Sequence, residues 1–152
     1  MKISITYPVE GVTAIRIDNV LTDVLSQIGG FDYALSYLID ETVLIDTGFS
    51  WARKAMRKAL MELGADKTIK VVVNTHYHED HIGNNDLLLE MCAPKFYAHP
   101  LAITEIRFPH EPAWYRGFLF GPTGIQDVEP APRVIRTKRF RLELHHLPGH
   151  CP

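Results

Sequence analysis

Four side chains that can bind a metal ion lie within the six residues from 76 to 81: His76, His78, Asp80 and His81. Imidazole nitrogens and carboxylate oxygens are ligands of zinc and of its first-row neighbours. In an extended segment His76 and His78 project to the same side, so both can hold one ion. The density of ligands therefore predicts a metal site, and exposed loop histidines are the less specific alternative.

The composition describes one soluble domain. The chain has 152 residues, of which 46% are hydrophobic and 22% charged, and its net charge of -2 gives no attraction to nucleic acid or an anionic membrane. Two cysteines, Cys92 and Cys151, are too few for a disulfide framework and are compatible with a reducing compartment. The first eight residues lack an apolar signal core, and no segment is long enough to span a bilayer. We expect a cytoplasmic protein.

Short apolar runs bounded by turn residues predict strands in the first third of the chain. Residues 18–32 between them are expected to form a loop or a short helix. Ser50 is a candidate N-cap for a helix that continues to Leu63 and ends at Gly64. The predicted strands are residues 2–6, 12–17, 33–39 and 42–45.

The Val-rich run 69–74 predicts a buried strand whose carboxyl end delivers the histidine cluster. Loops at that end of an open α/β sheet commonly bind ligands. Asn84 or Asn85 can cap the next helix, and the Pro- and Gly-rich region 109–132 is typical of a lid. The remaining predicted elements are a strand at 95–98, a helix at 101–107, and a last strand or strand pair at 134–147 that contains His145 and His146.

Three motifs in order resemble the metallo-β-lactamase fold. Thr75–Gly83 resembles the HxHxDH signature, while Leu44–Gly48 and Leu147–His150 resemble the upstream strand-and-turn and the third-histidine motif. The resemblance implies an α/β fold of layered type, the N-terminal half of an αββα sandwich with its metals at one edge of the two sheets. It also implies two groups of ligands: His76, His78 and His150 for a first metal, and Asp80 and His81 for a second.

All-nitrogen and oxygen ligation favours zinc as the cofactor, with one or two ions per complete site; iron and manganese are alternatives because geometry and supply also select the metal. A bound ion lowers the pKa of water to about 7, and Asp80 is the candidate catalytic residue that orients the resulting hydroxide. We expect hydrolysis of a small molecule of unknown class: an ester, thioester, lactone, amide or phosphodiester. Asp46 would support the ligand loop.

Members of this family continue beyond the third histidine to an acidic residue that bridges the metals and a further histidine. This sequence ends at Pro152. The expectation is therefore a single metallo-β-lactamase-like domain over residues 1–152, truncated after the third-histidine motif and impaired in hydrolysis. A homo-oligomer or a complementing chain is the alternative source of the missing residues.

Two other functions compete with the hydrolase. Leu44–Ser50 also resembles the catalytic turn of a half-sized aspartic protease, but a helix directly after it and an unexplained histidine cluster disfavour that interpretation. A non-catalytic metal-binding or assembly module is the second alternative. Cys151 lies next to His150, and we expect its thiol not to bind the metal.

Overall fold

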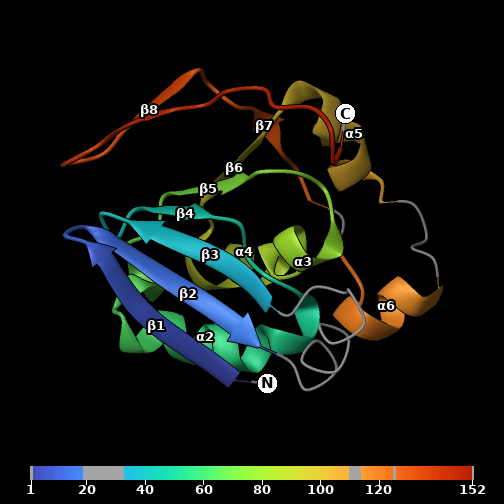
Figure 1. Cartoon of the computed structure of the whole chain (residues 1–152), viewed down its shortest axis with the longest axis horizontal. Helices are drawn as coiled ribbons and strands as arrows, with labels where there is room; N and C mark the ends of the chain where they lie inside the picture. Colours follow the sequence, from blue (N-terminus) through green and yellow to red (C-terminus); the bar gives the residue numbers. More distant parts are fainter. Residues whose placement is uncertain (1, 19–32, 110–113, 125, 152) are drawn as a thin grey trace.

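The computed structural model describes residues 2–18, 33–109, 114–124 and 126–151, with a seven-stranded sheet at its centre (Figure 1). The strands lie in chain order. β1 to β4 pair antiparallel, and β4 to β7 pair parallel. Their bounds are β1 (Lys2–Val9), β2 (Val12–Asp18), β3 (Tyr33–Ile39), β4 (Val43–Ile45), β5 (Val71–Asn74), β6 (Lys95–Ala98) and β7 (Glu129–Pro130).

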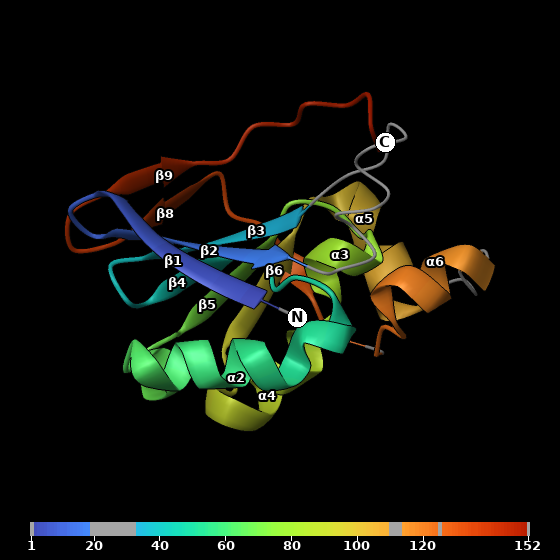
Figure 2. The ribbon, with the colours of Figure 1, turned by 60° about the horizontal axis from the view of Figure 1, so that its bottom comes forward.

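Helices α2 (Arg53–Glu62) and α4 (Asn85–Cys92) cover one face of this sheet (Figure 2). Met56, Leu60 and Leu87 are fully buried there, because apolar residues at helical spacing form one stripe toward the sheet. None of the helices in the described ranges is long and apolar enough to cross a membrane. The other helical elements are η1 (Ser50–Ala52), η2 (Ala65–Lys67), α3 (Glu79–Ile82), α5 (Pro100–Arg107) and α6 (Trp114–Phe120).

A two-stranded sheet, β8 (Val134–Arg136) paired with β9 (Arg141–Glu143), lies over the opposite face (Figures 1 and 2). Ile135 packs there in a buried cluster with Ile39, Val43 and Val73 of the main sheet. The order is therefore helices, main sheet, second sheet. This mixed arrangement confirms the predicted α/β fold, the N-terminal half of an αββα sandwich.

Some local predictions were wrong. Ser50 does not cap a helix through its side chain; its hydroxyl donates to the carbonyl of Phe120. Asn84 stands at the N-cap position of α4, but its side-chain amide donates to the carbonyls of Thr47 and Phe49. His145 and His146 follow β9 instead of lying on it. The prediction for residues 18–32 falls, after residue 18, outside the described residues.

Parallel pairing of β4, β5 and β6 brings three loops to one edge of the sheet. The register Val43↔Val71 and Val71↔Lys95 sets the strands side by side with the same direction. Asp46 follows β4, and the histidine cluster follows β5. Because the carboxyl ends of parallel strands share an edge, Asp46 and Thr75, 29 positions apart in the chain, meet there.

Asp40, in the turn after β3 of the main sheet, forms hydrogen bonds with the turn between β8 and β9 of the second sheet. Its side chain is only 2% exposed. Its carboxylate accepts hydrogen bonds from the hydroxyl of Thr137 (2.6 Å) and from the backbone N–H (2.6 Å) and Nη1 (2.7 Å) of Arg139. Burial opposes ionisation, but these hydrogen bonds outweigh it and lower the pKa of Asp40 to about 2.

We expect Asp40→Asn to destabilise the protein at neutral pH, because the amide keeps the shape but loses the charge that Arg139 recognises. The folded pKa lies below the usual value of 3.8, so this contribution is complete above about pH 4 and disappears as the pH falls toward 2. Urea unfolding at several pH values should show the wild-type and variant curves converging in acid. Asp127→Asn is the control, because Asp127 is 90% exposed although it also pairs with an arginine. A pH-independent difference for Asp40→Asn would contradict this account.

Candidate metal centre

Three histidines and one cysteine converge at the carboxyl end of β5. One ligand atom from each of His76, His78, His150 and Cys151 lies within 4.8 Å of all the others. His150 Nε2 is 3.0 Å from Nδ1 of His78, although the two residues are 72 positions apart. The structure thus brings together the three histidines predicted for the first metal and adds a thiol.

Asp46 connects the loop after β4 to the loop after β5, which carries His76, His78 and His81 and is called the histidine loop below. Its side chain is 6% exposed, and its carboxylate accepts hydrogen bonds from the backbone N–H of Thr75 (2.8 Å), the Thr75 hydroxyl (2.7 Å) and Nδ1 of His81 (2.7 Å). The φ angle of Asp46 is 55°, a left-handed conformation that Asp and Asn adopt more readily than most residues. The sharp turn aims the carboxylate at the loop that carries the predicted ligands.

These contacts determine which nitrogen of His76 is free to bind a metal. Because the Thr75 hydroxyl gives its hydrogen to Asp46, its oxygen accepts one from Nδ1 of His76 at 3.0 Å. The lone pair of His76 is then on Nε2, a buried atom without a hydrogen-bond partner among the described residues. Burial, followed by the neighbouring His81 and His78, lowers the pKa of His76 to about 3. A neutral imidazole with an unpartnered nitrogen fits a metal ligand.

Asp80 and His81, predicted for a second metal, lie beside this cluster as a pair. His81 Nε2 is 3.4 Å from Asp80 Oδ2, and the rings of His81 and His76 have centroids 3.9 Å apart. Burial disfavours the charged imidazole, but hydrogen bonds with Asp46 and Asp80 outweigh it and raise the pKa of His81 to about 10. The assignment of these two residues to a second metal stays a prediction.

The histidine loop is held on its other side by contacts that the sequence did not reveal. Arg116 of α6 donates from Nε to both carboxylate oxygens of Glu79, at 3.2 and 2.9 Å, and Glu79 is only 12% exposed. The same helix is also joined to η1, because the indole N–H of Trp51 donates to the carbonyl of Phe118. The predicted lid region at residues 109–132 therefore includes a helix, α6, that packs against the histidine loop.

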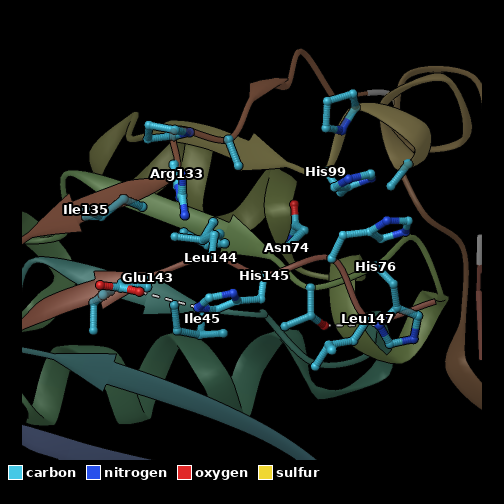
Figure 3. Close-up of a pocket in the computed structure, with 18 of the residues that line it drawn as sticks. Ile45, Asn74, His76, His99, Arg133, Ile135, Glu143, Leu144, His145 and Leu147 are labelled. Carbon is cyan, nitrogen blue, oxygen red and sulfur yellow. Dashed lines mark hydrogen bonds and ion pairs between the residues drawn. The ribbon is translucent and has the colours of Figure 1, made fainter.

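A groove of about 940 Å³ runs between the main sheet and the chain that leaves β9 (Figure 3). Its walls include apolar Ile45 and Leu144, and His76 lies at one end (Figure 3). His145 Nε2 lies 3.5 Å from Oε2 of Glu143. The ring of His146 stacks on the ring of His99, with the two ring centroids 4.1 Å apart. These three histidines line the groove but are outside the metal-ligand cluster.

Comparison with known proteins identifies the family. A sequence profile described as the metallo-beta-lactamase superfamily matches residues 29–152. The chain belongs to the metallo-beta-lactamase superfamily. The family that the three motifs resemble is thus confirmed. Membership of this superfamily is consistent with a metal-dependent hydrolase.

Solved metallo-beta-lactamases share the fold. The chain matches a motif mutant of an enzyme from Cronobacter sakazakii with a TM-score of 0.76 and 19% identity, over 99% of this chain and 57% of the other. It matches BJP-1 of Bradyrhizobium japonicum with a TM-score of 0.73 and 18% identity, over 97% of this chain and 53% of the other. At these identities the likeness establishes the fold alone.

Two curated relatives are similar in sequence over part of their length. Metallo-beta-lactamase domain-containing protein 1 of Mus musculus is 39% identical over 84 residues, which cover 54% of this chain and 32% of the mouse protein. Ribonuclease J 1 of Streptococcus pyogenes is 33% identical over 96 residues, covering 55% of this chain and 16% of that enzyme. The chain spans a third or less of these relatives, and about half of the matched structures.

The contacts of Asp46 also bear on the aspartic protease alternative. A protease of that class needs an aspartate that can reach its substrate, whereas the Asp46 carboxylate is buried and engaged by Thr75 and His81. Helix α2 follows η1 directly after the turn, in a mixed α/β fold. Together with the family match, these features leave that alternative without support.

We expect His78→Ala to lose the more tightly bound metal ion, because His78 lies between His150 and Cys151 in the cluster. Metal bound per chain should be measured by elemental analysis after loading with zinc and desalting. His145→Ala is the matched control, since His145 is 64% exposed and lies outside the cluster. Equal metal content in wild type and His78→Ala would refute the assignment of this ligand.

We expect Asp46→Asn to bind zinc about 10- to 100-fold more weakly, the usual effect of removing a group that orients metal-binding histidines. Asparagine tolerates the positive φ angle, but it has one acceptor oxygen where the carboxylate has two. Competition with a chromophoric chelator measures the affinity. Asp40→Asn is the control, because it is the same substitution at another positive φ angle of 46°. Equal losses in both variants would show a general effect of destabilisation.

Proposed function

We propose that this domain performs metal-dependent hydrolysis at the cluster of His76, His78 and His150. The observation that supports the proposal is the convergence of their ring nitrogens within 4.8 Å, with Asp80 beside them. Three imidazoles with a further open position are the ligand set of several catalytic zinc sites. Zinc is the metal we propose, and iron or manganese suits the same nitrogen and oxygen ligands.

The side chains divide the work of hydrolysis between them. His76, His78 and His150 would hold the ion, which when bound lowers the pKa of water at its open position to about 7. Asp80 would orient that water and accept its proton, because its carboxylate lies next to the cluster and is 18% exposed. Asp46 and Thr75 keep His76 in the tautomer that presents Nε2.

The substrate class we propose is a small molecule with an ester, thioester, lactone, amide or phosphodiester bond. The apolar walls of the groove that ends at His76 favour a substrate with an apolar part. Similarity to a protein named ribonuclease J 1 justifies including phosphodiesters in any test. Neither observation selects one bond type.

A non-catalytic metal-binding module is the second candidate, and one observation favours it. Structural zinc sites are closed by four protein ligands, and Cys151 supplies a fourth candidate atom in the cluster. Turnover of generic substrates with a chelator control would separate the two functions. A wild-type protein that binds metal but turns over none of the generic substrates would favour the non-catalytic metal-binding module.

We expect Asp80→Asn to reduce turnover by about 10² to 10⁴, the range for removing a positioned acid or base. Hydrolysis of p-nitrophenyl esters and of bis(p-nitrophenyl) phosphate by zinc-loaded protein provides the assay. Asp86→Asn is the control, because Asp86 pairs with Arg53 away from the cluster. Full activity of Asp80→Asn, or activity that survives metal removal, would exclude the proposed mechanism.

A further inference from the structure

The residue after the third histidine, Cys151, carries a thiol that the proposed hydrolysis does not use. Contrary to the expectation from the sequence, we propose that the thiol sulfur of Cys151 is a fourth protein ligand to the ion held by His76, His78 and His150, and that it closes the site. This inference rests on the proposed function, because it takes the same three histidines as ligands. It adds a form of regulation, since a closed site has no position for the attacking water.

The geometry places the sulfur among the histidine nitrogens. Cys151 Sγ lies 3.6 Å from Nε2 of His78, and His150 Nε2 lies 3.0 Å from Nδ1 of the same ring. One ligand atom from each of the four residues lies within 4.8 Å of the others. Two atoms that bind one ion at about 2.0 to 2.3 Å are commonly 3 to 4 Å apart, as the edges of a coordination tetrahedron require. Rotation of the His78 and Cys151 side chains would bring one His78 nitrogen and the sulfur onto the ion that His76 and His150 share.

A turn at Gly149 makes this arrangement possible. Neighbouring side chains in an extended strand point to opposite sides, so His150 and Cys151 could not both face one site from such a strand. Here Gly149 has a φ angle of 148°, and its N–H donates to the carbonyl of Cys151 at 3.1 Å. This short turn presents two consecutive residues to the same cluster.

The surroundings of the two cysteines differ. Cys92 lies at the end of α4, and its thiol donates to the carbonyl of Leu88, which satisfies it locally. Cys151 is half-buried, and its thiol lies beside His78 in the cluster of possible ligands. The cysteine near the histidines is therefore the one placed to bind metal, and Cys92 provides a control in the same chain.

Ligation has a defined chemical balance. The thiol loses its proton to solvent as the sulfur–metal bond forms, and the sulfur takes the position that water would otherwise fill. Three nitrogens and one thiolate favour zinc over harder ions. Hydrolysis then requires the sulfur to leave the ion, so Cys151 would suppress turnover while it is bound.

Cobalt(II) substitution tests this proposal directly. Wild type, Cys151→Ser and Cys92→Ser should each be loaded with Co²⁺ and recorded by absorption spectroscopy. We expect one Co²⁺ per chain in all three, with a near-ultraviolet thiolate-to-cobalt band in wild type and Cys92→Ser. That band should be absent in Cys151→Ser, whose visible cobalt bands remain. Cys151→Ala serves as a second variant if serine disturbs folding.

The possible failures are distinguishable. Cobalt binding with no thiolate band in wild type would overturn ligation by Cys151 and leave the histidine site standing. A band that persists in Cys151→Ser and Cys151→Ala would overturn it as well. No cobalt binding in any variant would overturn both this inference and the proposed function. Increased ester hydrolysis by zinc-loaded Cys151→Ser relative to wild type would support the suppressing role.

Discussion

The carboxylate of Asp46 is the interaction on which the metal site depends. One buried group accepts three hydrogen bonds from the histidine loop, two through Thr75 and one from His81. It thereby joins the loops after β4 and β5 and sets the tautomer of His76 through the Thr75 hydroxyl. A metal site needs ligands whose orientation is fixed before the ion arrives, and this contact provides that fixation for His76.

The third histidine reaches the site by a different route. The chain crosses from the main sheet to β8 and β9, and Asp40 holds that hairpin through Thr137 and Arg139. After β9 the chain passes along the groove until His150 meets His78. The site thus combines a preorganised loop on parallel strands with a segment anchored by the second sheet.

The sequence predicted the parts of this structure that depend on local pattern. Period and composition placed the strand at residues 95–98, with the same bounds as β6, and the spacing of His76 and His78 indicated a metal site. The sequence could not reveal the pairing of Glu79 with Arg116 or the approach of Cys151, because these contacts join segments far apart in the chain. The predicted helix caps were wrong for the same reason. The side chains of Ser50 and Asn84 donate hydrogen bonds to carbonyls far away in the chain instead of capping a helix.

X-ray absorption at the zinc edge of the zinc-loaded protein tests the central claim most directly. The account predicts one tightly bound zinc per chain with a shell of imidazole nitrogens at about 2.0–2.1 Å, including the outer-shell scattering that is characteristic of histidine rings. Zinc that is lost on desalting, or a shell of oxygens without imidazole scattering, would contradict the assignment of His76, His78 and His150 as metal ligands.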